Sequence, residues 1–356
     1  MQNELTKQLG ITYPLIQAPM AGGVTTTKLV AAVSSCGGLG MIGAGYLTPF
    51  QMREQIKQIQ KATTKPFGVN LFVPSSIRTS EEEVREANQF LKPYLEKYNL
   101  QPETKPLLPT ELAWEQFEQQ LKVIVEEKVP ICSFTFELPT DEQISLLKEH
   151  DVLLIGTATN VKEAMLSEQK GMDMVVVQGT EAGGHRGSFM DDSKSLIGLM
   201  SLIPQVVDRV QIPVIAAGGI MDGRGMSASL CLGAKGVQMG TAFLTCKESG
   251  APEIHKKAIL QALDDATVLT RSFSGKWARG LNNVFIEEMK AYEDQLPDFP
   301  IQNILTKQLR QVAAKENNMD FMSLWSGQSP LLAKDQSVGE LISRTIAETK
   351  AIMHLK

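Results

Sequence analysis

The chain has 356 residues, with 35 Lys and Arg against 40 Asp and Glu, and its formal net charge is -5 at pH 7. This length allows one large domain, or a domain with an appendage, and the mildly acidic balance excludes nucleic acid and anionic lipid as main partners. No apolar run approaches 18 residues and residues 1–10 lack the layout of a secretory signal, so we expect no membrane association.

Short apolar runs that end in Gly, Asn or Gln alternate with amphipathic stretches. The predicted strands are Pro14–Ala18, Leu39–Gly43, Phe67–Phe72, Ile131–Phe136, Val152–Thr157, Met174–Gln178, Pro213–Ala217 and Gly236–Gly240. The predicted helices are Thr26–Ser35, Pro49–Lys61, an interrupted stretch within Glu81–Glu127, Thr140–Glu149, Val161–Lys170, Ser201–Asp208 and Gly225–Leu232. The strands are almost continuously apolar, which indicates a sheet covered on both faces. The alternation of strand and helix predicts a parallel sheet.

Eight such units favour an α/β fold of the (β/α)₈ TIM-barrel type, and an open doubly wound sheet is the alternative. We predict a barrel over residues 1–250, with a helical insertion at about 73–130 that serves as a lid or flank on the barrel top. Residues 251–356 are predicted to supply the last barrel helix and a C-terminal helical subdomain, with a Pro-containing loop at Tyr292–Pro300.

The ends of the first and third strands offer ligand contacts, because βα loops carry the reactive groups of such barrels. The first strand runs into Ala18-Pro19-Met20-Ala21-Gly22-Gly23, where glycine lets backbone approach a planar ligand and Met20 adds a polarizable surface. A tight turn explains Gly22 and Gly23 equally well. Asn70 on the third strand can bond a heterocycle edge or serve as a structural amide.

The sixth strand runs directly into a glycine-rich loop, Gln178-Gly179-Thr180-Glu181-Ala182-Gly183-Gly184-His185-Arg186-Gly187. Imidazole titrates near neutrality, so His185 suits proton abstraction or hydrogen bonding to an anionic substrate. The remaining histidines are expected to be solvated or to cap helices; they are His150, His255 in a predicted surface helix, and His354.

The seventh and eighth strands end in Gly218-Gly219 and in Gln238-Met239-Gly240-Thr241. Loops at these two positions commonly hold a phosphate through backbone N–H groups. Neither a P-loop nor a strand-linked Rossmann fingerprint occurs. A mononucleotide with its phosphate at strands seven and eight and its ring toward strands one, three and six fits this pattern, and FMN is such a mononucleotide.

Cysteine usage predicts neither a zinc site nor a disulfide framework. The four residues lie far apart without a CxxC pair, and they are Cys36, Cys132, Cys231 and Cys246. Isolated thiols fit a reducing, cytoplasmic setting. With only four histidines in the chain, no metal site is expected.

Five ordered motifs together resemble the nitronate monooxygenase family, formerly called 2-nitropropane dioxygenases, over residues 10–330. The motifs are LIQAPMAGG, FGVNLF, QGTEAGGHRG, PVIAAGGIMD and GVQMGTAF. The resemblance implies an FMN-dependent barrel that converts alkyl nitronates such as propionate 3-nitronate and O₂ to a carbonyl compound and nitrite.

Carried over by motif, His185 is the catalytic residue, a base toward neutral nitroalkanes and a partner for bound nitronate. The implied FMN contacts are Ala18, Met20, Asn70, Gln178, Gly183, Gly218, Gly219, Gln238, Met239, Gly240 and Thr241. A later stretch, residues 273–280, is also similar to the family; its Arg279 could meet a substrate carboxylate or be a salt-bridged surface residue.

Two other functions stay open on the sequence. An NAD(P)H-dependent flavin reductase of the enoyl-acyl-carrier-protein or quinone reductase type would use the same barrel and similar glycine loops. A non-catalytic flavin-binding or phosphate-binding protein would keep the loops but would not need His185. The oligomeric state cannot be derived from the sequence.

Overall fold

The computed structural model describes residues 1–75, 80–105, 110–190 and 196–354. Its main sheet is parallel, in the order β1-β9-β8-β6-β5-β4-β3-β2. The strands are β1 (Leu15–Gln17), β2 (Gly40–Gly43), β3 (Phe67–Phe72), β4 (Ile131–Thr135), β5 (Leu153–Ala158), β6 (Met174–Gln178), β8 (Val214–Ala217) and β9 (Gly236–Met239). All eight predicted strands are therefore confirmed, as is the TIM barrel.

The sheet closes between β1 and β2, which excludes the open-sheet alternative. The backbone N–H of Gln17 donates to Leu39 O over 2.9 Å, and the N–H of Leu39 donates to Leu15 O over 2.9 Å. The side chain of Gln17, fully buried, adds a third link because its Oε1 accepts from the N–H of Met41 over 3.0 Å. The side chain of Gln17 thus helps to join β1 to β2, which share few backbone hydrogen bonds.

The barrel interior is packed with apolar side chains and is closed at its amino-terminal end by α1 (Glu4–Leu9). Leu5 and Leu9 of this helix join the interior cluster, which includes Ile16, Met174 and Ile215. Asn3 caps α1 by accepting from the N–H of Thr6 over 3.0 Å. The short helix was not predicted from the sequence, and it leaves only the opposite end of the barrel available for a ligand.

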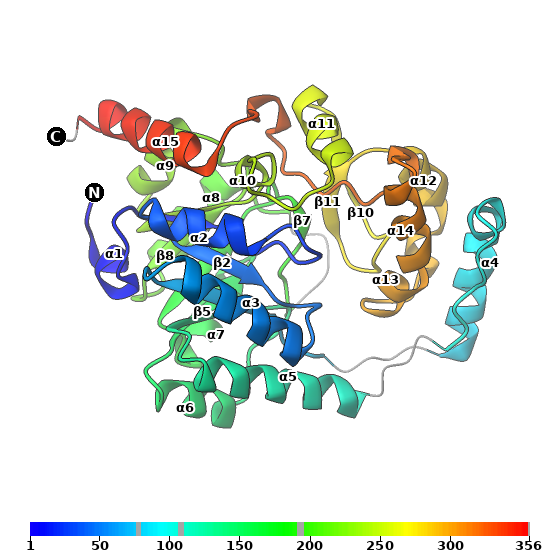
Figure 1. The fold of residues 1–356 in the computed structure, drawn as a ribbon, viewed down its shortest axis with the longest axis horizontal. Helices are drawn as coiled ribbons and strands as arrows, with labels where there is room; N and C mark the ends of the chain where they lie inside the picture. Colours follow the sequence, from blue (N-terminus) through cyan, green and yellow to red (C-terminus); the bar gives the residue numbers. More distant parts are fainter. Residues whose placement is uncertain (76–79, 106–109, 191–195, 355–356) are drawn as a thin grey trace.

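One helix follows each barrel strand and covers the outside of the sheet. They are α2 (Thr27–Ser35), α3 (Pro49–Ala62), α5 (Thr110–Glu126), α6 (Asp141–Lys148), α7 (Val161–Gln169), α8 (Leu199–Val207), α9 (Gly223–Cys231) and α15 (Val338–Ile352). Several begin at side-chain caps; Thr48, for instance, caps α3 in a capping box with Gln51. The helix expected to follow the eighth strand is α15, which packs beside α9 and α2 (Figure 1).

A second lobe, here called the C-terminal lobe, occupies the chain between β9 and α15. Its helical elements are α10 (Thr241–Leu244), α11 (Glu253–Gln261), α12 (Val284–Met289), η1 (Lys290–Gln295), α13 (Ile301–Leu305), α14 (Lys307–Lys315), η2 (Met319–Phe321) and η3 (Pro330–Leu332). We predicted a helical subdomain here, but the lobe also contains strands. Strands β10 (Thr267–Thr270) and β11 (Ala278–Leu281) form an antiparallel sheet with β7 (Gly184–His185). A 3-10 helix, η1, also covers part of the predicted loop at 292–300.

The insertion after β3 divides into two helices with different neighbours. Helix α5 is the barrel helix of its unit and packs on α3 and β3. Helix α4 (Glu81–Lys97) instead packs on the C-terminal lobe, where Tyr94 meets Phe285 with ring centroids 5.1 Å apart. It lies on the side of that lobe away from the barrel (Figure 1), so it does not act as a lid over the barrel.

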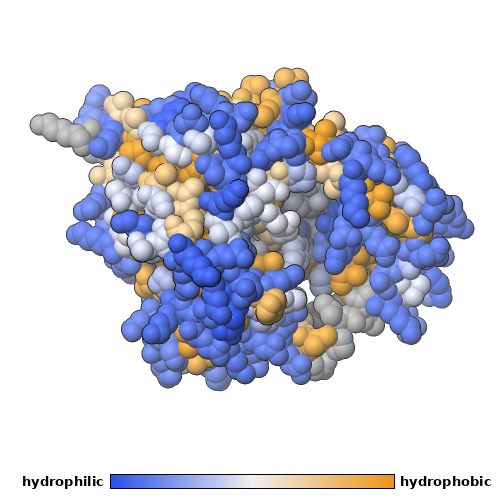
Figure 2. Space-filling model, viewed as in Figure 1, coloured by the Kyte–Doolittle hydropathy of each residue, from blue (hydrophilic) through white to orange (hydrophobic). Residues whose placement is uncertain are grey.

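The surface of the barrel and the C-terminal lobe is largely hydrophilic in the view of Figure 2, with apolar residues in separate patches. Among the described helices, none is long and apolar enough to cross a membrane.

Candidate active site

A cavity of about 370 Å³ lies where the carboxyl ends of the barrel strands face the C-terminal lobe. The sequence-predicted residues that line it are Ala18, Met20, Asn70, Gln178, Gly183, His185, Gly218, Gly219, Gln238, Gly240 and Thr241. Only Met239 of the predicted set does not line it. The side chain of Met239 is buried among apolar residues under the barrel helices, while its carbonyl oxygen accepts from the N–H of Ala18 over 2.8 Å.

One side of the cavity presents unused backbone donors. In the described part of the chain, no protein acceptor bonds the N–H groups of Gly219, Gly240 or Thr241. Gly219 has φ +65°, a conformation that side chains beyond glycine rarely adopt. Thr241 Oγ1 accepts from Gly327 N over 2.8 Å, so its own proton is free to donate. Three N–H groups and a hydroxyl at two strand tips suit the phosphate of a mononucleotide.

The cavity also offers amide groups beside an apolar floor. Asn70 donates to Ser133 Oγ over 2.9 Å and to Thr135 Oγ1 over 3.1 Å, which leaves its carbonyl oxygen for a ligand. The side-chain amide of Gln238 has no hydrogen-bond partner within the described ranges. Ala18 and Met20 supply apolar surface next to these amides. This donor and acceptor set fits the edge and face of a planar heterocycle such as a flavin ring.

His185 is held in the cavity by strand pairing across two lobes. It forms β7 with Gly184 and pairs with Ala278 of β11. Gln178, at the tip of β6, fixes the other side of the loop, because its Nε2 donates to His185 O over 2.9 Å and its Oε1 accepts from Gly187 N over 2.7 Å. The predicted cofactor contact Gln178 therefore has a clear structural task as well.

The imidazole of His185 is enclosed by aromatic rings. Its centroid lies 5.7 Å from the Phe136 ring, 5.6 Å from Phe299 and 5.5 Å from Trp325. The Nε2 atom is buried and has no hydrogen-bond partner among the described residues. An unpartnered buried polar atom is costly in a protein unless a ligand satisfies it. Nε2 of His185 is therefore available to a ligand that enters the cavity.

Electrostatics keep His185 neutral. Burial, reinforced by the charges of Lys276 and Arg310, lowers the pKa of His185 to about 3. The Nζ atom of Lys276 lies 5.4 Å from the centroid of the Phe136 ring, beside the imidazole. A neutral imidazole among cations can accept a hydrogen bond or a proton, and the same cations attract an anionic ligand.

Phe136, which packs on His185, has φ +80°, a strained conformation for an aromatic residue. Such strain persists where the surroundings enforce it and is frequent at functional sites. It turns the ring at the tip of β4 toward Phe72 and Phe299, with centroids 4.5 Å and 5.1 Å away.

His255 was predicted on a surface helix, and this prediction is wrong. It is 6% exposed, lines the cavity, and its Nε2 lies 3.1 Å from Trp325 O. Because a carbonyl oxygen only accepts, Nε2 carries the proton of this bond. Burial lowers the pKa of His255 to about 4 although the bond to Trp325 opposes this shift. Nothing in the short pattern around His255 distinguishes it from a surface position. His150, in contrast, is exposed at the end of α6, where its Nδ1 lies 2.9 Å from Leu146 O.

Arg279 is neither a surface residue nor part of the cavity wall. It is 7% exposed; its Nε donates to Thr180 O over 2.9 Å and its Nη1 to Thr267 Oγ1 over 3.2 Å. It therefore braces the loop that leads to His185. The cation that does line the cavity is Arg310, on α14, which the sequence reasoning did not identify.

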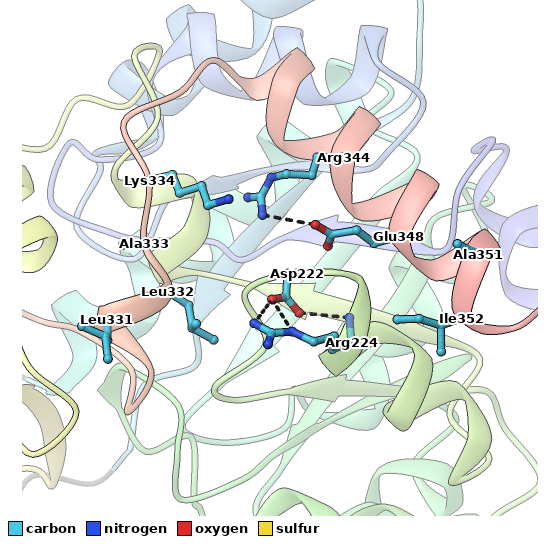
Figure 3. A pocket seen from close by; sticks show the side chains of 10 residues that line it. All are labelled: Asp222, Arg224, Leu331, Leu332, Ala333, Lys334, Arg344, Glu348, Ala351 and Ile352. Carbon is cyan, nitrogen blue, oxygen red and sulfur yellow. Dashed lines mark hydrogen bonds and ion pairs between the residues drawn. The ribbon is translucent and has the colours of Figure 1, made fainter.

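A second, more open cavity of about 530 Å³ lies between α9 and α15 (Figure 3). Four of its charged side chains are paired: Arg224 with Asp222 over 2.5 Å and Arg344 with Glu348 over 3.6 Å. Lys334 also lines the cavity and has no ion pair among the described residues. It contains neither histidine nor cysteine. Across the described residues, no cluster of His, Cys, Asp and Glu could hold a metal ion. The cavity around His185 is accordingly the candidate active site.

Comparison with known proteins gives a consistent result. Residues 2–348 match the family model described as "Nitronate monooxygenase". A "Probable nitronate monooxygenase" of Staphylococcus haemolyticus is 50% identical over 99% of this chain and 98% of its own length. Its namesake in Staphylococcus aureus (strain Newman) is 48% identical over 100% and 99%.

Solved structures agree with the fold. The nitroalkane oxidase from Streptomyces ansochromogenes has a TM-score of 0.92 at 39% identity and covers 99% of both chains. FabK from Thermotoga maritima has a TM-score of 0.79 at 31% identity, covering 99% of this chain and 98% of its own. An enoyl reductase domain at 11% identity and TM-score 0.69 shares the fold alone.

Proposed function

The chain belongs to the nitronate monooxygenase family and is a flavin-dependent oxidoreductase, and from this premise we propose that its cofactor is FMN and its substrates are alkyl nitronates such as propionate 3-nitronate. With O₂, the reaction would give a carbonyl compound and nitrite. The observation that carries the proposal is the buried, unpartnered Nε2 of His185, which faces the same cavity as the free donors of the strand tips.

The residues that would hold FMN fall into two groups. The N–H groups of Gly219, Gly240 and Thr241 would bind the phosphate, with Gly218 allowing close approach. The amides of Asn70 and Gln238 would bond the ring edge, and the residues beside the ring would be Ala18, Met20, Gln178 and Gly183. When bound, the flavin supplies the electron-transfer chemistry between nitronate and O₂.

His185 has a different task with each form of the substrate. A nitronate is already anionic, so the imidazole needs only to orient its nitro oxygens, which it does in the tautomer with the proton on Nε2, in a field made favourable by Lys276 and Arg310. A neutral nitroalkane must first transfer its α-proton to Nε2, which requires the tautomer with the proton on Nδ1. That proton transfer creates an imidazolium beside two cations, so it is unfavourable unless the nitronate that is formed stays bound and offsets the positive charge. We therefore expect preformed nitronates to be better substrates than nitroalkanes.

The decisive experiment mixes the yellow, purified protein anaerobically with propionate 3-nitronate or with NADPH and follows the flavin absorbance. Bleaching by the nitronate, followed by nitrite release when air is admitted, supports the proposal. Bleaching by NADPH alone would assign the chain to the flavin reductases, a possibility that the match to FabK keeps in view. A flavin that responds to neither reagent would indicate a binding protein.

We propose the reducing cytoplasm as the compartment. All four cysteines are free thiols, and Cys132 and Cys246 are buried in the core. Free thiols without disulfides accord with a reducing setting.

A further inference from the structure

The guanidinium of Arg310 stands in the wall of the active-site cavity, held rigidly by its neighbours. Its Nη2 donates to Asn303 O over 2.7 Å and to Asn303 Oδ1 over 2.8 Å. Its Nε donates to Thr306 Oγ1 over 3.2 Å. These bonds tie α14 to α13 and fix the plane of the fork, while Nη1 forms no hydrogen bond with the described residues.

All of these acceptors are neutral. Over the described ranges, no carboxylate pairs with Arg310, and burial lowers the pKa of its guanidinium. The partly exposed arginines Arg53, Arg271 and Arg344 each have a carboxylate partner; Arg271, for example, lies 2.6 Å from Asp298. Arg279 also donates to neutral oxygens, but it lies outside the cavity. An arginine is charged at any pH at which the protein is folded, so enclosing it without an anion costs free energy. A ligand that brings a negative group would remove this cost.

The neighbourhood of Arg310 suits an anion. Tyr46 lines the same cavity, and its phenol is protonated at neutral pH and can donate a hydrogen bond. Arg310, Tyr46 and His185 line the same cavity of about 370 Å³. A small molecule with an anionic group at each end could therefore contact Arg310 and His185 together. Arg279, the other arginine considered for this task, is committed to Thr180 and Thr267.

We propose that Arg310, together with Tyr46, forms an anion subsite that binds a carboxylate of the substrate while its nitronate group faces His185. The inference rests on the proposed function and deepens it, because it assigns the enzyme to nitronates that carry a carboxylate and names the specificity-determining residue. A guanidinium offers a carboxylate paired N–H donors, and with Nη2 and Nε already engaged the free Nη1 supplies the strongest new contact.

The test compares two substrates of equal carbon number, propionate 3-nitronate and propyl 1-nitronate, which differ in the carboxylate. Arg310→Gln should lower kcat/KM for propionate 3-nitronate by about 100-fold and for propyl 1-nitronate by no more than about threefold. Arg310→Lys should recover part of the loss, because it keeps the charge. Arg344→Gln, a half-buried arginine outside the cavity, is the matched control and should change neither value. Equal losses on both substrates, or none on either, would overturn the proposal.

A second measurement does not depend on turnover. Succinate has the shape of propionate 3-nitronate with a carboxylate in place of the nitro group, so it should bind without reacting. Its dissociation constant, taken from the change in the flavin absorption spectrum, should rise at least about 30-fold in Arg310→Gln. If no nitronate is oxidised but succinate still binds in an Arg310-dependent way, the proposed function fails and the anion subsite stands. Succinate affinity unchanged by the substitution contradicts the subsite.

Discussion

Gln178 donates from Nε2 to the backbone carbonyl of His185 over 2.9 Å, and the same amide accepts from Gly187 two residues later. One side chain at the tip of β6 thereby spans the loop that carries the imidazole of His185. The opposite edge of the loop pairs with β11, a strand of the C-terminal lobe. The position of His185 thus depends on contacts from both lobes, and each can be tested.

Gln178→Leu should remove the link between β6 and the His185 loop. The carbonyl of His185 and the N–H of Gly187 lose their partners, so we expect a loss of about 1–3 kcal/mol in the free energy of unfolding. Activity on nitronate and nitroalkane should fall together. Urea unfolding and steady-state nitrite release measure the two effects. Gln238→Leu is the control: its amide has no protein partner in the described structure, so stability should hold while flavin affinity falls. If Gln238→Leu lost more stability than Gln178→Leu, the structural role given to Gln178 would be refuted.

His185→Asn should retain the yellow flavin and lose activity on neutral nitroalkanes by about two to four orders of magnitude, the scale of a general base. Activity on the preformed nitronate should fall much less, because no proton has to be removed. Both rates are measured by nitrite release. One assay starts from nitronate that has been generated beforehand in alkali, and the other starts from the neutral nitroalkane. Equal losses on both substrates would argue against a base.

Gly219→Ala should weaken flavin binding by about tenfold. The new methyl group would lie 3.2 Å from Glu181 Cβ, and a left-handed backbone costs a non-glycine residue about 1–2 kcal/mol. Titration of the apoprotein with FMN gives the affinity. Gly339→Ala in α15 is the control, since its Cβ would meet only Cys36 Sγ at 3.9 Å. If both variants bound FMN equally well, the loop at Gly219 would have no role in flavin binding.

His255 should make the protein less stable in acid. Its folded-state pKa of about 4 lies below the ordinary value of 6.5, so between these values the unfolded chain takes up a proton that the folded chain refuses. Stability is therefore lost as pH falls from about 6.5 to 4, by up to about 1.4 kcal/mol per pH unit from this residue. His255→Gln keeps a donor for Trp325 O but does not titrate, so its unfolding free energy in urea should vary less between pH 6 and 4.5. Parallel pH profiles would contradict the assignment.

The barrel strands were predictable because parallel strands covered on both faces are almost continuously apolar, as in Met174–Gln178. Glycine-rich strand ends then located the cavity. Strand β7 has two residues, Gly184 and His185, and only its pairing with Ala278 and Arg279 makes it a strand. No local pattern encodes that contact, so the small antiparallel sheet was missed.

The same reason explains the errors at the site. His255 and Arg310 lie on helices whose polar residues look like solvent-facing positions, and only the docking of the C-terminal lobe onto the barrel encloses them. Arg279 was misassigned because its partners, Thr180 and Thr267, come from segments far apart in the sequence. Side chains recruited by tertiary packing leave no local signal.

The last barrel helix, α15, comes after the whole C-terminal lobe, and its Leu341 and Ile342 complete the apolar layer shared with Leu29 and Val33 of α2. All eight barrel strands are complete by Met239, but almost the whole chain must be synthesised before α15 can cover the apolar faces of α2 and α9. A chain truncated before Val338 would lack α15, so the apolar faces of α2 and α9 would be exposed to solvent.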